Sequence, residues 1–156
     1  GVAIVAWTYA TLGVRDKAVM AALAEHIVQT GLFNTFNAQD VANTAWSYAR
    51  LGIADTALLS ALAERSMHDG VLPTFTAQNV ANTAWAYARL RVQHATLMSA
   101  LSDLIKQEAF LSSFNAQEVA NTCWAYARLG IKHDALMEAL AERVMHNDIL
   151  STLNAQ

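Results

Sequence analysis

The sequence predicts an all-α fold, an α-solenoid of four stacked helix-hairpin repeats with about eight helices. The first observation is a stretch at residues 37–52, NAQDVANTAWSYARLG, that recurs almost unchanged at 76–91 and 115–130. The second is a 39-residue period in the tryptophans, which stand at Trp7, Trp46, Trp85 and Trp124. A fixed period between about 20 and 50 residues is typical of repeat arrays, in which each unit buries its apolar face only by stacking on its neighbours.

This period divides the chain into one array, with repeats at roughly residues 1–36, 37–75, 76–114 and 115–153. A shortened copy opens the chain at 1–13, and the last three residues begin another unit, so we expect a fragment of a longer array. The apolar content of 54% and the single proline argue against disorder. The apolar runs are too short to insert into a membrane.

The first helix of the second, third and fourth repeats starts at a predicted capping box, in which an N-cap side chain and the residue three positions on each accept the other's backbone amide. The pairs with this spacing are Asn37 with Asp40, Thr76 with Asn79, and Asn115 with Glu118. A phenylalanine precedes each cap and is placed to pack on the valine of the first turn as a hydrophobic staple.

Within the first helix of the second repeat, we expect Trp46 to supply most of the buried area among small alanines. Tyr48 should also face the core, with its hydroxyl at a rim. Arg50 favours the negative end of the helix, and Gly52 ends it. In the third repeat Arg91 stands in place of that glycine, so we expect a strained or differently shaped turn there.

A second helix is predicted at residues 55–68, with counterparts at 16–29, 94–107 and 133–146. Its apolar face in the second repeat consists of Leu58, Ala61 and Leu62. Each repeat is therefore an antiparallel helix pair, and stacking four pairs gives a superhelix.

Residues that could carry out catalysis or bind a metal show no recurring pattern. Cys123 replaces an alanine of the other repeats, and we expect it to be a small buried residue. The five histidines fall at different repeat positions, mostly at helix ends, without metal-ligand spacing. The sequence also lacks a nucleophile–base pair and a glycine-rich phosphate loop. We expect neither an enzyme nor a cofactor, a metal or a small-molecule substrate.

The centre of the unit, ANTAWSYARLG, resembles the signature of the octotricopeptide repeat family and of its relatives with a RAP domain. The similar positions are Asn43-Thr44, Trp46, Ala49 and Leu51-Gly52; Asn82-Thr83, Trp85, Ala86, Ala88 and Leu90; and Asn121-Thr122, Trp124, Ala125, Ala127 and Leu129-Gly130. The first copy departs from the signature at Ile4-Val5. The resemblance implies sequence-selective RNA binding in a chloroplast or mitochondrion, with roughly one base per repeat.

A candidate RNA-binding surface follows from the polar residues of the first helix, because residues three and four apart are neighbours on a helix. In the second repeat these are Gln39, Asn43, Ser47 and Arg50. The arginines Arg50, Arg89 and Arg128 would contact phosphates. The recurring asparagines Asn43, Asn82 and Asn121 either line this surface or satisfy carbonyls between units, and the second interpretation carries more weight.

Base discrimination requires positions that vary between repeats, since a residue identical in every unit cannot distinguish one base from another. Two such positions are expected to be exposed, one with Asp40, Asn79 and Glu118 and the other with Ser47 and its counterparts. The capping box already explains the first position structurally, so its role in recognition stays open.

The charge distribution bears on whether the partner is RNA or protein. The formal net charge of −3 is unfavourable for a phosphate-binding protein. All acidic residues except Asp40 and Glu118 nevertheless fall in or beside the second helices, which leaves the first helices with recurring arginines. We therefore expect binding of single-stranded RNA along the first-helix surface. The alternative is a protein-interaction scaffold within a larger organellar complex, such as a ribosome or a membrane assembly.

Overall fold

A computed structural model describes residues 1–146, and these residues form nine α-helices without any strand, as the all-α prediction requires. The helices are α1 (Val2–Leu12), α2 (Lys17–Gln29), α3 (Ala38–Leu51), α4 (Thr56–Met67), α5 (Ala77–Arg89), α6 (Ala95–Ile105), α7 (Glu108–Leu111), α8 (Ala116–Arg128) and α9 (Asp134–Met145). Two 3₁₀ helices, η1 (Leu32–Thr35) and η2 (Leu72–Thr74), connect hairpins, and the short α7 occupies the equivalent connection after α6.

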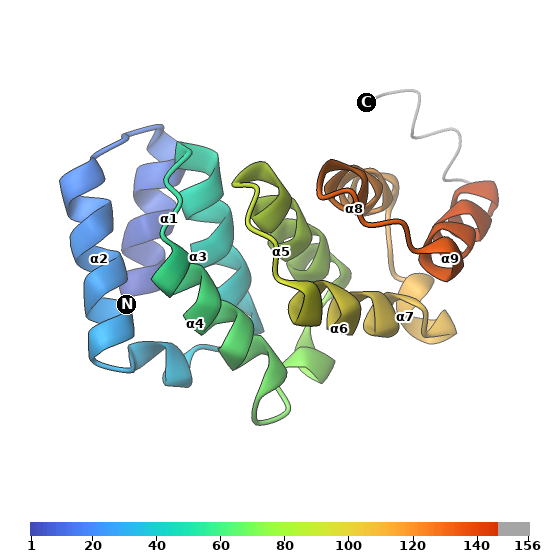
Figure 1. Cartoon of the computed structure of the whole chain (residues 1–156), viewed down its shortest axis with the longest axis horizontal. Coiled ribbons are helices and arrows are strands. Elements are labelled where there is room, and N and C mark those ends of the chain that lie inside the picture. The colour runs from blue at the N-terminus through green and yellow to red at the C-terminus, as the bar shows by residue number, and fades with distance from the viewer. Residues whose placement is uncertain (147–156) are drawn as a thin grey trace.

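The eight longer helices form two layers of a curved stack (Figure 1). The first helices α1, α3, α5 and α8 pack side by side, and the second helices lie along the outside of the arc. Neighbouring first helices contact each other more extensively than neighbouring second helices do. Alanines such as Ala42, Ala45 and Ala49 are fully buried and allow this close approach. Because one layer packs more tightly than the other, the stack bends and the first helices form its inner layer.

Tyrosine hydroxyls bond the first helices α3, α5 and α8 to the preceding hairpin. The hydroxyls of Tyr48 and Tyr126 donate hydrogen bonds of 2.6 Å to the carbonyls of Met20 and Met98, and Tyr87 donates to the carbonyl of Leu59. All three rings are buried, so the expectation that their hydroxyls lie at a rim is wrong. Burial raises the pKa of each phenol above its ordinary value.

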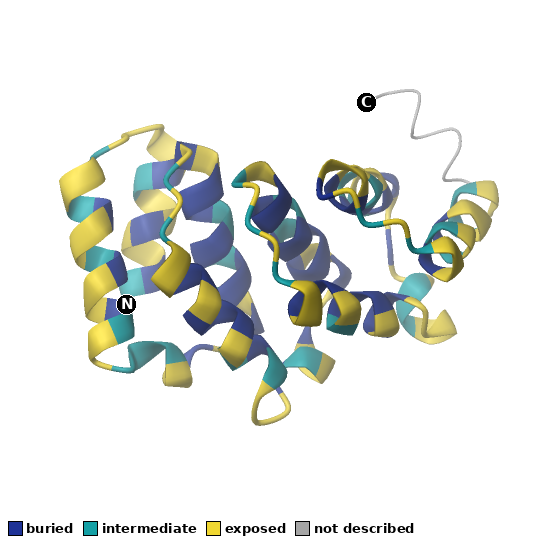
Figure 2. Cartoon of the chain, viewed as in Figure 1, coloured by how far each residue is buried: buried dark blue, intermediate teal, exposed yellow. Residues whose placement is uncertain are grey.

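The tryptophans are not the centre of the core, contrary to the expectation from sequence. Trp7 and Trp124 are 44% and 41% exposed, and Trp46 and Trp85 are partly exposed. Tyrosine, leucine and alanine side chains fill the core instead. Figure 2 shows the buried parts of the helices in dark blue. The indoles lie along the edge of the inter-helix packing, because a helix of small residues brings its neighbours too close to bury a ring of that size between them. Cys123 is likewise only partly buried, although it was expected in the core.

Local capping signals specify the helix starts as predicted. The Asp40 amide donates to Asn37 at 2.8 Å, and the Asn37 amide donates back to the Asp40 carboxylate at 3.1 Å. The other two capping boxes are formed as well, at Thr76 with Asn79 and at Asn115 with Glu118. At the end of the third repeat's first helix, Arg91 adopts a left-handed φ of 57°, where Gly52 and Gly130 have 66° and 67°. A side chain at this φ is strained, which confirms the expectation for this turn.

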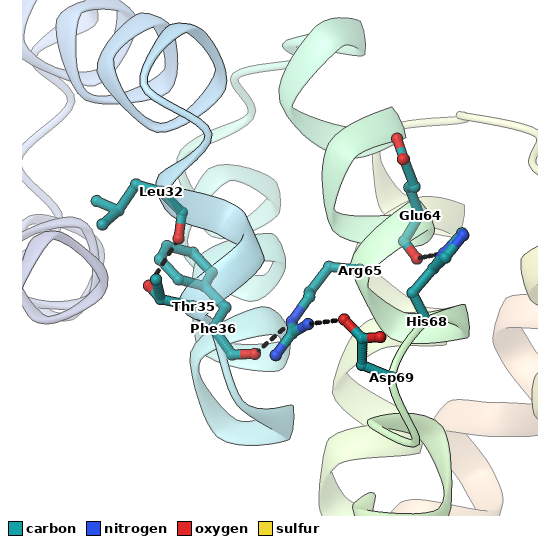
Figure 3. Close-up of polar contacts among 7 residues, drawn as sticks. All are labelled: Leu32, Thr35, Phe36, Glu64, Arg65, His68 and Asp69. Carbon is teal, nitrogen blue, oxygen red and sulfur yellow. Dashed lines mark hydrogen bonds and ion pairs between the residues drawn. The ribbon is translucent and has the colours of Figure 1, made fainter.

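An arginine near the end of a second helix ties that helix to the start of the first helix of its own repeat (Figure 3). The Arg65 Nε donates to the Phe36 carbonyl at 2.8 Å, and its Nη1 lies 3.2 Å from the Asp69 carboxylate. Arg143 makes the equivalent bond to the Phe114 carbonyl at 2.9 Å. These carbonyls belong to the loop just before the N-cap, so the contact fixes the angle between the two helices of a hairpin.

Two histidines act as N-cap residues. The Nδ1 atoms of His94 and His133 accept the backbone amides of Leu97 and Leu136 at 3.1 and 3.2 Å. In the first two repeats an aspartate, Asp16 or Asp55, occupies this position. These imidazoles therefore have a structural role at the start of α6 and α9.

Candidate nucleic-acid interface

The inner layer presents the same four residue types on three consecutive helices. On α3 they are Gln39, Asn43, Trp46 and Arg50, with the glutamine and arginine exposed and the other two partly exposed. Spacings of four, three and four place them on one stripe of the helix surface. The same stripe recurs as Gln78, Asn82, Trp85 and Arg89 on α5 and as Gln117, Asn121, Trp124 and Arg128 on α8. Stacking the helices turns the stripes into rows of amides, indoles and guanidinium groups.

The amide rows line a groove that crosses the first helices. A hollow of about 630 Å³ over α1, α3 and α5 is lined by Trp7, the amides of Gln39 and Asn43, and those of Gln78 and Asn82. A second hollow of about 240 Å³ continues it between α5 and α8, where Gln78 and Asn82 are joined by Gln117 and Asn121. We call this surface, made by these six amides, the amide groove. Each amide offers both donors and an acceptor, which suits the edges of nucleobases or a peptide backbone.

The predicted site residue Ser47 does not belong to this surface. Its side chain is fully buried, and its Oγ donates a 2.6 Å hydrogen bond to the Asn43 carbonyl. The counterparts Ala86 and Ala125 are also buried, so the expectation that this position varies on an exposed surface is wrong. Both Trp46 and Ser47 are helical neighbours of Asn43, and contact between the first helices decides which of them faces outward. Trp46 takes the place in the stripe that Ser47 was expected to have.

The other variable position, occupied by Asp40, Asn79 and Glu118, lies at the rim of the amide groove. Asn79 is only 9% exposed and the other two are partly buried, so these residues are less exposed than expected. In each capping box one side-chain oxygen accepts the amide of the N-cap residue, at 3.1, 3.0 and 3.4 Å respectively. The other terminal atom of the side chain takes no part in the capping box. It is a carboxylate oxygen in Asp40 and Glu118 but an NH₂ donor in Asn79. Burial raises the pKa of the Glu118 carboxyl.

The arginine row, Arg50, Arg89 and Arg128, lies in the last turn of the three helices and is exposed. Within residues 1–146 the ion pairs are those of Arg65 with Asp69 and of Lys106 with Asp103. The charges of the arginine row are therefore not neutralised by a carboxylate in this part of the chain. They are available to an anionic ligand that follows the inner layer.

No group of three or more His, Cys, Asp or Glu side chains in 1–146 is placed to hold a metal ion. None of the helices described is both long enough and apolar enough to cross a membrane.

Comparison with known proteins adds one match. A family model described as RNA-editing substrate-binding complex 6 protein matches residues 1–155. None of the curated proteins matches the chain. The matched model is not that of the octotricopeptide repeat family, which the Asn-Thr-x-Trp pattern resembles.

Proposed function

The chain belongs to the RNA-editing substrate-binding complex 6 protein family, and from this premise we propose that it binds single-stranded RNA along its inner layer of first helices. The arginine row would contact phosphates, and the amide groove would hold the bases. The observation that carries the proposal is the repetition of the stripe on α3, α5 and α8, because a polymer ligand presents the same chemical groups at regular intervals.

The distribution of charge supports this orientation of the ligand. The three arginines of the row are exposed on the inner layer, whereas the acidic residues of the chain fall mainly in or beside the outer helices. A phosphate backbone would therefore meet positive charge on one layer only. We further propose that the protein acts in RNA processing, stability or translation within a chloroplast or mitochondrion, as the resemblance of its repeats to octotricopeptide repeats implies.

A protein-interaction scaffold within a larger organellar complex is the second candidate function. It is favoured by the formal net charge of −3, which is unusual for a phosphate-binding protein. In this case the amide groove would hold an extended peptide segment, since amides also pair with peptide N–H and C=O groups.

The experiment that tests RNA binding replaces Arg50, Arg89 and Arg128 together by glutamine. We expect affinity for single-stranded RNA to fall for all sequences alike. The negative slope of log K against log salt should become shallower by about two units, because about 0.7 counterions are released per phosphate contact on a single strand. A control on the outer layer replaces the exposed Lys17 and Lys106 by glutamine and should change that slope little.

A single substitution at the groove rim tests base recognition. Asn79→Asp exchanges the unused NH₂ donor for an acceptor while the capping box with Thr76 can still form, as the Asp40 box shows. It should change base preference with little effect on the salt slope. The proposal fails if the wild-type protein shows no salt-dependent binding to a pool of single-stranded RNA; the scaffold function would then be the better explanation.

A further inference from the structure

The tryptophans form a row along the inner layer in which each indole remains partly exposed. Trp7 lines the amide groove, and Trp46, Trp85 and Trp124 lie in the stripes between the asparagine and the arginine. Large aromatic side chains that remain partly exposed at the same position of every repeat are typical of a binding surface rather than of packing. We call these four residues the tryptophan row.

Two members of this row form an aromatic pair on neighbouring first helices. The ring centroids of Trp85 and Trp124 are 6.5 Å apart, with an angle of 33° between their planes. Rings at this centroid distance are in ordinary aromatic contact, so the pair presents one aromatic surface. Trp124 is 41% exposed, which leaves part of this surface open to a base.

The neighbouring rows match the other parts of a nucleotide. Along each helix the arginine lies one turn beyond the tryptophan, and the asparagine lies one turn before it. A ring held at the tryptophan row would therefore have guanidinium groups on one side for the phosphate and amides on the other for the base edge.

We infer that the exposed indoles of the tryptophan row, beginning with the Trp85–Trp124 pair, form platforms on which unpaired nucleobases stack. This inference rests on the proposed RNA-binding function and specifies how the RNA is held. Every base has a π face, so the platforms accept all four bases and select unpaired over paired RNA. Sequence preference then comes from the groove rim at Asp40, Asn79 and Glu118 and not from the row itself.

The test compares a ten-residue uridine oligonucleotide with an abasic oligonucleotide of the same length and with a duplex RNA. Stacking should quench the tryptophan fluorescence of the wild-type protein with the uridine oligonucleotide alone. Trp124→Ala should weaken binding of this oligonucleotide by about tenfold, the loss expected for one stacked base, and leave the salt slope unchanged. Trp124→Phe, which keeps an aromatic ring, should recover part of the affinity.

Met145 provides a matched control, because it is 74% exposed on the outer helix α9 and Met145→Ala removes apolar surface there instead. Circular dichroism and thermal unfolding establish that each variant is folded. Equal affinity of the wild type for the uridine and abasic oligonucleotides, or unchanged affinity of a folded Trp124→Ala variant, would overturn the stacking inference while leaving RNA binding intact. Binding of an extended peptide but of none of the RNAs would overturn both.

Discussion

Replacing Tyr87 by alanine should destabilise the protein more than replacing Trp85 by alanine, although tryptophan is the larger residue. Tyr87 is fully buried, and its hydroxyl bonds the Leu59 carbonyl in the preceding hairpin. Removing a buried aromatic ring costs about 3–5 kcal/mol, and the lost hydrogen bond adds about 1 kcal/mol. Trp85 is partly exposed, so less apolar surface returns to water and we expect a cost of about 2 kcal/mol.

Urea denaturation followed by circular dichroism measures both free energies of unfolding. Tyr87→Phe keeps the ring and removes only the hydroxyl, and it should cost about 1 kcal/mol. Tyr9→Phe is the control for this change, because Tyr9 lies in the first repeat and is only partly buried. If Trp85→Ala proves as destabilising as Tyr87→Ala, then the indoles and not the phenols hold the hairpins together, and the packing described above is wrong.

Two further predictions concern the contacts between and within hairpins. Because burial raises the pKa of Tyr48, Tyr87 and Tyr126, the folded protein keeps phenolic protons that the unfolded chain releases above about pH 10. The contribution of these tyrosines to stability should therefore be constant below that pH and should fall as the pH rises above it. Urea denaturation midpoints measured from pH 8 to 11 should fall less for Tyr48→Phe than for the wild type. Arg65→Leu should lower the free energy of unfolding by about 1.5–3 kcal/mol, because the bond to the Phe36 carbonyl is lost. Asp69→Asn removes only an exposed ion pair and should change the free energy of unfolding by less than about 0.5 kcal/mol. Equal effects of the two variants in thermal or urea unfolding would contradict the assigned role of the carbonyl contact.

The amino-acid sequence by itself determined the eight longer helices, their starts and their order. Capping boxes, staples and apolar spacing are local signals, since each involves residues three or four apart on one helix. The same locality explains why several residues of the candidate surface lie on one stripe of the helix. Asn43 and Arg50 lie on the stripe that spacing predicted, and this stripe recurs in three repeats because the sequence recurs.

Only the tertiary structure decided which side of each helix is left exposed. Positions three and four residues from Asn43 are equally its neighbours, and local spacing cannot choose between Trp46 and Ser47. Close contact between alanine-rich first helices buries Ser47 and leaves Trp46 at the edge. The bond from Tyr48 to the Met20 carbonyl joins residues of different hairpins, and the amide groove joins helices of different repeats. These features depend on the distance between helices, which side-chain volumes across the whole stack determine.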